Sequence, residues 1–320
     1  MLSEKYFDSP DVQTYMNIAN GKFDNQSLVR RYRIVIPFLA KVFSIPIEKV
    51  YKKIWKNRVH PDDPLKFSFF LVNLTIMAIV GIVIFHLCCY FCQDYFLSFF
   101  STLIFLLAGR WGSLIAGLPY TDSLYILVIS LLWLGLLKNN RTLITLSLIL
   151  GFVAKESFVL FLPLLALGVS RKNIVLVLTA LLLGISLAFG VRWVIDSNTH
   201  TQMMQSLEED VEHIHVIGLS LLRIAQPRGI GELMTPLGVF SILNLIGIIS
   251  GIKFWQAIIP KLGISFWMFT TIIWIHALLS NEVGRMLYIG GAAWTIFLCM
   301  TIKYHPLFSK FYQNLLNFNQ

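Results

Sequence analysis

The stretch FSFFLVNLTIMAIVGIVIFHLCCYFC, residues 67–92, contains no Asp, Glu, Lys or Arg over its 26 residues. A helix of about 20 apolar residues crosses the hydrocarbon core of a bilayer. The apolar residues follow one another without alternating with polar ones, which favours a helix over a strand of a membrane barrel. This stretch therefore predicts a membrane-spanning helix.

The rest of the chain has the same character. Of its 320 residues, 56% are hydrophobic and only 13% are charged, which is too little polar surface to cover a globule of this size. Further apolar runs lie at 95–118, 122–138, 174–195, 233–251, 264–279 and 286–302, with an interrupted run at 142–170. We expect an all-α polytopic transmembrane helix bundle with about 8–9 membrane segments.

The charges indicate partners and orientation. The net charge is +9, but the basic residues flank apolar runs, so membrane lipids are the expected partners and nucleic acid is not. Loops rich in Lys and Arg stay on the cytoplasmic side. The loops on the other side, including one at about 196–232, carry nine carboxylates of the membrane domain. The working face is therefore expected to be the outer one.

Residues 1–66 precede the first apolar run and carry twelve Lys and Arg. We expect an outer-face loop region here, followed by a transmembrane domain over 67–320. Helices lying on the membrane surface are predicted at 31–56 and at 201–217, from their mixture of apolar and charged residues. A basic segment resists translocation, so this placement also predicts a first helix before Met1. Alternatively, 1–66 is cytoplasmic and the number of spans differs by one.

The interrupted run, 142–170, holds the charged tetrapeptide AKES at 154–157. Residues 142–154 make about 20 Å of helix, which is short of a roughly 30 Å hydrocarbon core. We therefore expect a short re-entrant-like hairpin with Lys155 and Glu156 at its tip, where charge is tolerated beside protein or a water-filled cavity. Alternatively, Lys155 snorkels to the membrane surface and Glu156 caps a helix.

Several short motifs follow one another along the chain in a characteristic order. They are Tyr120-Thr121-Asp122-Ser123, the basic turn 138–141, Lys155-Glu156 and Leu162-Pro163, preceded by SPDVQTYMNIANG (9–21) and RRYRIVIPFLA (30–40) and followed by NEVGRML (281–287). This order resembles GT-C-type membrane glycosyltransferases that use polyprenyl-phosphate sugars, including the GPI mannosyltransferases. Those enzymes usually have more spans and a helix before the first-loop Asp, and the chain departs from them in both respects.

The resemblance implies a function. It implies transfer of a sugar from a polyprenyl-phosphate donor to a lipid, glycan or protein acceptor, in a bacterial cytoplasmic membrane with the active site facing outward. Asp11 matches the family's first-loop catalytic carboxylate and is the expected general base. The alternative for Asp11 is that it caps the helix that follows it.

The same resemblance implies substrate-binding roles for residues of the other motifs, namely Tyr120, Asp122, Lys155, Glu156 and Arg285. Arg285 is the favoured cation for the departing phosphate because its planar guanidinium can hold two oxygens. A divalent metal ion is a candidate cofactor, with Asp11 and Asp122 as weak candidate ligands. The alternatives are that Asp122 caps a helix and that Arg285 serves only as the partner of Glu282.

Two other functions stay open. A transporter or flippase would use Lys155 and Glu156 in a broken helix near the midplane of the membrane. A non-catalytic membrane subunit would use neither residue chemically. The sequence identifies neither the sugar nor the acceptor.

Overall fold

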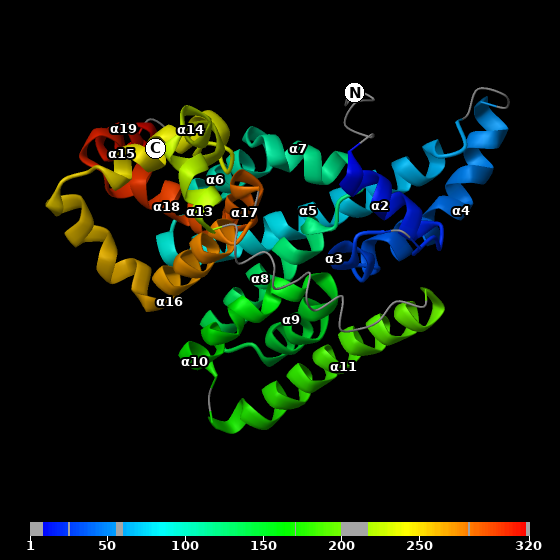
Figure 1. Ribbon diagram of the computed structural model, residues 1–320. Helices are drawn as coiled ribbons and strands as arrows, with labels where there is room; N and C mark the ends of the chain where they lie inside the picture. Colours follow the sequence, from blue (N-terminus) through cyan, green and yellow to red (C-terminus); the bar gives the residue numbers. More distant parts are fainter. Residues whose placement is uncertain are drawn as a thin grey trace. The chain divides into compact units, whose positions relative to one another are not determined.

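The computed structural model describes residues 9–24, 26–55, 60–169, 171–199, 217–280 and 282–317 (Figure 1). Every regular element in these ranges is a helix, as the sequence predicts. The chain divides into two compact units. The first comprises 1–80, 114–159 and 168–214, and the second comprises 81–113, 160–167 and 215–320.

Three helices are long and apolar enough to cross a membrane: α5 (Asp63–Cys92), α11 (Ile174–Thr199) and α16 (Ile252–Leu278). Two bent pairs pass the same test, α6 (Tyr95–Ala108) with α7 (Arg110–Gly117), bent by 68°, and α17 (Val283–Ile289) with α18 (Gly291–Tyr304), bent by 71°. The described residues therefore provide three to five candidate spans, consistent with an integral membrane protein.

The other predicted spans are shorter helices. They are α8 (Asp122–Leu137), α9 (Arg141–Ala154), η2 (Glu156–Leu164) with α10 (Leu165–Gly168), and η5 (Gly238–Phe240) with α15 (Ser241–Ile248). None reaches the roughly 20 residues that a straight crossing needs. The expected number of 8–9 segments therefore stays a prediction.

The first unit begins with α2 (Pro10–Ala19), α3 (Leu28–Arg31) and α4 (Val35–Trp55). Helix α4 is continuous through Pro37 and Pro46. Pro37 lies in the first turn, where the backbone N–H has no helical partner to lose. Exposed apolar side chains such as Phe38 and Phe43 are what a surface-lying helix requires. The second predicted surface helix, 201–217, lies outside the described residues except Ile217, where α13 (Ile217–Ala225) begins.

Helices α8, α9 and α11 pack together in the first unit (Figure 1). The turn between α8 and α9 is closed by Asn140, whose side chain accepts a hydrogen bond from the Leu143 N–H at 3.2 Å. After α9 the chain returns to this same end, where the Asn173 amide, in η3 (Arg171–Asn173), donates to the Asn139 side chain at 3.3 Å. The segment from α9 to α10 is thus a hairpin, with Lys155 and Glu156 at the far end.

The second unit is built around α6, α17 and α18, with α15 against α18. The Phe105 and Tyr288 rings stack with their centroids 4.7 Å apart. Helix α16 is kinked at Gly263, whose φ of 64° suits glycine. Helices α14 (Pro227–Leu233) and α19 (Pro306–Asn317) complete the unit.

Candidate functional site

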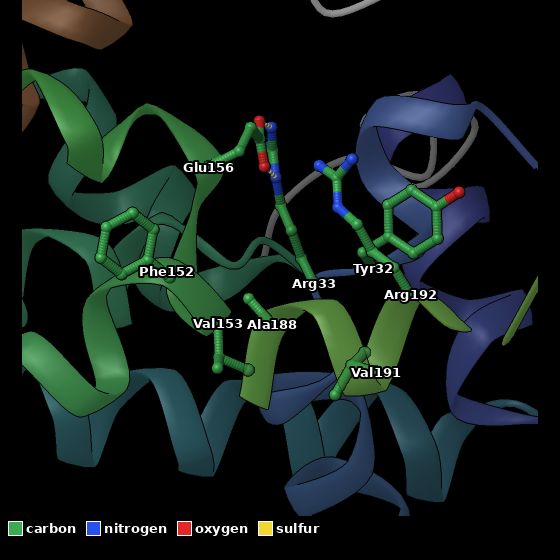
Figure 2. Close-up of a pocket in the computed structure, with 8 residues that line it drawn as sticks. All are labelled: Tyr32, Arg33, Phe152, Val153, Glu156, Ala188, Val191 and Arg192. Carbon is green, nitrogen blue, oxygen red and sulfur yellow. Dashed lines mark hydrogen bonds and ion pairs between the residues drawn. The ribbon is translucent and has the colours of Figure 1, made fainter. Parts of the chain in front are cut away.

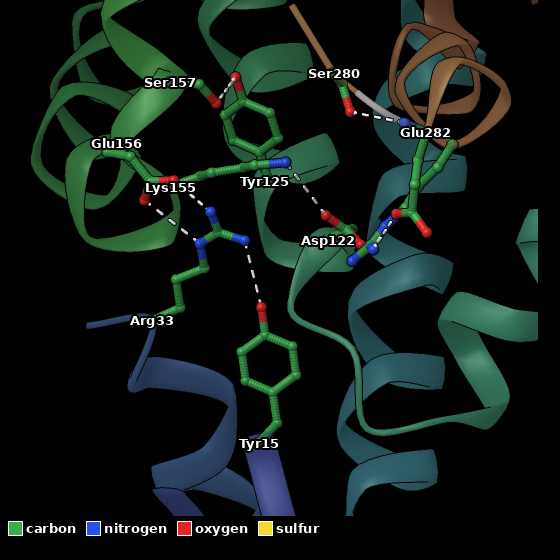
Figure 3. Close-up of polar contacts among 10 residues, drawn as sticks. Tyr15, Arg33, Asp122, Tyr125, Lys155, Glu156, Ser157, Ser280 and Glu282 are labelled. Atoms are coloured by element: carbon green, nitrogen blue, oxygen red, sulfur yellow. Dashed lines mark hydrogen bonds and ion pairs between the residues drawn. The ribbon is translucent and has the colours of Figure 1, made fainter. Parts of the chain in front are cut away.

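The tip of the hairpin carries two ion pairs that join distant parts of the first unit. Arg33, between α3 and α4, binds the Glu156 carboxylate through Nη2 and through Nε, the latter 3.4 Å from Oε2. Its Nη1 also donates to the Tyr15 hydroxyl at 3.3 Å (Figure 3). One guanidinium thus connects α2, the start of α4 and the hairpin tip.

The second pair involves the neighbouring residue. Helix α9 ends at Ala154, and Lys155 is extended, with φ −165° and ψ 135°. Its Nζ lies 3.7 Å from Asp122 Oδ1 and 5.2 Å from the centroid of the Tyr125 ring. The Ser157 hydroxyl donates to the Tyr125 hydroxyl at 3.1 Å (Figure 3). Asp122 and Tyr125 are three residues apart on α8, so they share a helix face.

A third contact fixes the loop before α8. Asn73, on α5, donates through its amide to the carbonyls of Leu118 and Tyr120 at 3.0 and 3.1 Å. Its oxygen accepts from the Ser123 hydroxyl at 2.6 Å. These three bonds hold the Tyr120–Ser123 motif on α5 and thereby position Asp122 opposite Lys155.

Both pairs are largely shielded from solvent. The side chains of Asp122 and Lys155 are 0% and 9% exposed, and that of Arg33 is 8% exposed. Removing charges from water costs several kcal/mol per ion, which only a close partner and further hydrogen bonds offset. Burial by itself lowers the pKa of Arg33, but the Glu156 and Tyr15 groups beside it raise that pKa above its usual value. The guanidinium is therefore charged at every pH at which the protein is folded.

A further layer of charge borders the tip. The Tyr32 hydroxyl donates to Asp196 Oδ1 at 2.7 Å, and Arg31 Nη1 lies 3.9 Å from the same oxygen. The guanidinium carbon of Arg192 lies 4.6 Å from the centroid of the Tyr32 ring. Next to these groups is a small pocket, shown in Figure 2, which is lined by Tyr32, Arg33, Phe152, Val153, Glu156, Ala188, Val191 and Arg192.

Asp11 lies near this cluster but has its own partner. Its Oδ1 is 2.7 Å from Arg30 Nη2. The alternative role of N-cap is wrong, because Ser9 is the N-cap of α2 and accepts from the Val12 N–H, leaving Asp11 in the first turn. Asp11 and Tyr15 are four residues apart and therefore share a face of α2.

The alternative roles of Asp122 as a helix cap and of Lys155 as a snorkelling side chain also differ from what the structure shows. Thr121 occupies the N-cap position of α8, so Asp122 is the first helical residue, and its side chain faces Lys155. Lys155 is buried and does not snorkel to a surface. Asp122 and Lys155 form an ion pair with each other, and their substrate-binding roles stay a prediction.

Arg285 belongs to the second unit. It is buried in α17, with Nη1 2.6 Å from Glu282 Oε2 and Cζ 5.8 Å from the centroid of the Trp111 ring. The pairing with Glu282 is thus present. The substrate-binding role of Arg285 stays a prediction.

For a metal ion, the described residues provide no group of three or more His, Cys, Asp or Glu side chains. Both weak candidate ligands face cations, Asp11 facing Arg30 and Asp122 facing Lys155. No residue set that would hold a divalent metal can therefore be named among them.

Sequence reasoning missed several residues of this cluster. These are Arg33, which lies in the 30–40 motif without a role assigned to it there, and Asn73 and Tyr125, which belong to none of the motifs. Asn73 carries a usable signal, because an amide inside an apolar span needs a hydrogen-bond partner. Tyr125 carries none, since aromatic residues are common in such helices.

Comparisons of the chain with known protein families, with curated proteins and with solved structures find no match.

Proposed function

We propose that the protein is a GT-C-type membrane glycosyltransferase. It transfers a sugar from a polyprenyl-phosphate donor to a lipid, glycan or protein acceptor, at the outer face of a bacterial cytoplasmic membrane. The proposal rests on the order of the sequence motifs and on one structural observation. The pairs Arg33–Glu156 and Lys155–Asp122 bring three of those motifs, otherwise far apart in the chain, to one buried cluster.

The chemistry assigns a role to each group. The acceptor hydroxyl oxygen forms a bond to the anomeric carbon as the bond from that carbon to the phosphate oxygen breaks. The acceptor proton passes to a carboxylate, and the phosphate leaves with the bonding electron pair. Asp11 is the general base, because it matches the first-loop carboxylate of the sequence motif and a carboxylate can accept that proton. Lys155 and Arg33 are the cations that stabilise the departing phosphate.

The carboxylates Asp122 and Glu156 hold these cations in place. The Tyr120 carbonyl accepts a hydrogen bond from the Asn73 amide, which fixes the backbone of the same loop. A lipid-linked donor carries its leaving group with it, so the site needs cations and an apolar groove more than a nucleotide-binding motif. None of the usual nucleotide-binding motifs occurs in the sequence.

The experiment that tests the base is the substitution Asp11→Asn. Membranes containing the protein are given radiolabelled undecaprenyl-phosphate mannose, glucose or arabinose, and release of undecaprenyl phosphate is measured. Loss of a general base lowers the rate about 100-fold or more. The matched control is Asp24→Asn, which changes an exposed aspartate of the same region.

Full activity of Asp11→Asn would remove Asp11 as the base. The transporter alternative predicts a different pattern. Substitutions Lys155→Met and Glu156→Gln would then abolish movement of a substrate across the membrane, while Asp11→Asn would leave it unchanged. A non-catalytic subunit would release no undecaprenyl phosphate with any donor, and this outcome would overturn the proposed transfer.

A further inference from the structure

Lys155 is held by its backbone at the point where the hairpin turns. Its N–H donates to the Gly151 carbonyl at 3.0 Å, and its carbonyl accepts from the Phe158 N–H at 3.0 Å. These two bonds fix where the side chain begins. The ammonium, however, stands at the end of a flexible four-carbon stem. The position of the charge therefore depends on contacts that are made further along the side chain.

The Asp122 carboxylate attracts this ammonium. The distance from Lys155 Nζ to Asp122 Oδ1 is 3.7 Å, which is longer than a hydrogen bond. At this length the contact is an attraction between two charges, and it restrains their separation more than the direction of the side chain. A contact from a second side is what sets that direction.

The ring of Tyr125 provides such a contact. Lys155 Nζ lies 5.2 Å from the centroid of this ring, within the range at which an aromatic ring attracts a cation. Tyr125 is completely buried, and this attraction is stronger where water does not compete for the ammonium. The ring and the Asp122 carboxylate stand one turn apart on α8, and the same ammonium lies beside both of them (Figure 3).

The Tyr125 ring is also tied to the segment that carries Lys155. Its hydroxyl accepts a hydrogen bond from the Ser157 hydroxyl at 3.1 Å. Ser157 follows Lys155 closely in the chain, so the hairpin tip contacts this one side chain through an ammonium and through a hydroxyl. Phenylalanine at position 125 would keep the face of the ring and lose only the hydrogen bond. Leucine would lose both contacts.

We propose that Tyr125 is a positioning residue, whose ring holds the Lys155 ammonium where it meets the substrate phosphate. This role rests on the proposed function, in which Lys155 stabilises the departing phosphate. A cation that is already in place stabilises a developing charge without having to move during the reaction. Tyr125 acts through Lys155 and takes no part in the transfer of the proton.

The first test compares two substitutions in the purified full chain, with release of undecaprenyl phosphate as the measurement. Tyr125→Leu is expected to lower kcat about tenfold and to change KM for the lipid-linked sugar less than about twofold, because the ring contributes to transition-state stabilisation rather than to binding. Tyr125→Phe is expected to keep kcat within about twofold of the parent value, since it retains the ring. A loss in Tyr125→Phe as large as that in Tyr125→Leu would assign the effect to the hydroxyl and overturn the role of the ring.

The second test measures the ammonium itself and needs no sugar transfer. The purified protein is treated with the acetylating reagent N-hydroxysuccinimide acetate, and acetylation of Lys155 is followed by peptide mass spectrometry. Lys138, which is exposed at the other end of α8, is the internal reference. The rate at Lys155 is expected to rise about tenfold in Tyr125→Leu and to stay near the parent value in Tyr125→Phe. A parent-like rate in Tyr125→Leu would overturn the proposal.

Trp133→Leu is the matched control for a general loosening of the unit. Trp133 is also completely buried on α8, two turns beyond Tyr125 and about 12 Å further along the helix axis. This substitution removes a larger ring, and the acetylation rate of Lys155 is expected to stay near that of the parent protein. A rise as large as that in Tyr125→Leu would show that any lost ring exposes Lys155, and the specific role of Tyr125 would be wrong.

The two measurements separate this role from the proposed function. If the parent protein releases no undecaprenyl phosphate with any donor, the proposed transfer is wrong and the role of Tyr125 in it falls as well. The acetylation rates still decide in that case whether the ring holds the ammonium. If the parent protein transfers sugar and Tyr125→Leu matches it in both tests, the function stands and only the role of Tyr125 is wrong.

Discussion

The two units each contain a cation paired with a carboxylate, but the pairs are built differently. In the first unit, Arg33 and Glu156 are 123 residues apart, and Lys155, which follows α9, pairs with Asp122 of α8. In the second unit, Arg285 and Glu282 are three residues apart, and the Glu282 side chain is 51% exposed. A local, half-exposed pair is a common feature of a helix start and contributes at most about 1 kcal/mol.

The pairs of the first unit need a different explanation. Two apolar residues of similar volume would often stabilise the fold as well as a buried ion pair does, so stability is a weak reason for burying charges. Charges held close together out of water are the arrangement with which enzymes stabilise developing charge. The comparison therefore places the candidate chemistry at the hairpin tip rather than at Glu282.

The largest expected effect comes from breaking the innermost pair. Lys155→Met leaves Asp122, whose side chain is 0% exposed, facing an apolar group. An uncompensated buried charge lowers the free energy of unfolding by about 3–5 kcal/mol. The measurement is unfolding of the purified protein in mixed detergent micelles. In the double variant with Asp122→Asn most of this loss is expected to be recovered, and a loss of similar size in both variants would contradict the pairing.

An intermediate effect is expected from the residue that holds the loop before α8. Asn73→Leu removes three hydrogen bonds and leaves two buried carbonyls and the Ser123 hydroxyl without that partner. The free energy of unfolding should fall by about 2–3 kcal/mol. Thr75→Val on the same helix is the control, since Thr75 is exposed and bonds only within its helix. Equal stability of the two variants would show that the loop is held by other contacts.

The smallest effect is expected in the second unit. Glu282→Gln removes the carboxylate beside Arg285 but keeps a side chain that accepts a hydrogen bond. The expected loss of unfolding free energy is about 1 kcal/mol or less. The same measurement as for Lys155→Met makes the comparison direct. A loss as large as that of Lys155→Met would mean that the two regions are energetically alike, and the contrast drawn here would be wrong.

Much of the helical architecture could be predicted from the sequence, because the length of an apolar run predicts the length of the helix that it forms. The runs 67–92 and 174–195 correspond to α5 and α11, and the short run before Lys155 corresponds to α9. Hydropathy does not predict where a helix bends, however. The runs 95–118 and 286–302 are each bent near a glycine, at Gly109 and Gly290. A glycine in an apolar run is too common to predict such a bend.

The partners in the site were harder to predict. Lys155 and Asp122 are two charges in otherwise apolar surroundings, where each needs an opposite charge, so their pairing could be inferred from the sequence. The pair of Arg33 with Glu156 could not be predicted, because nothing in the sequence distinguishes Arg33 from Arg30 and Arg31 as the partner of Glu156. The short helix α3 and the turn after it decide which guanidinium reaches the hairpin, and each of the three takes a different carboxylate.

Residues beside the two bends of the second unit contact one another. The Tyr288 hydroxyl, beside the bend after α17, donates at 3.4 Å to the Phe105 carbonyl in the last turn of α6. A Cβ on Gly112, just past the other bend, would stand 2.9 Å from that hydroxyl. Homologues of this chain should therefore conserve Gly112 and Tyr288 together or replace both. Substitutions at the two positions should be correlated in an alignment of homologues.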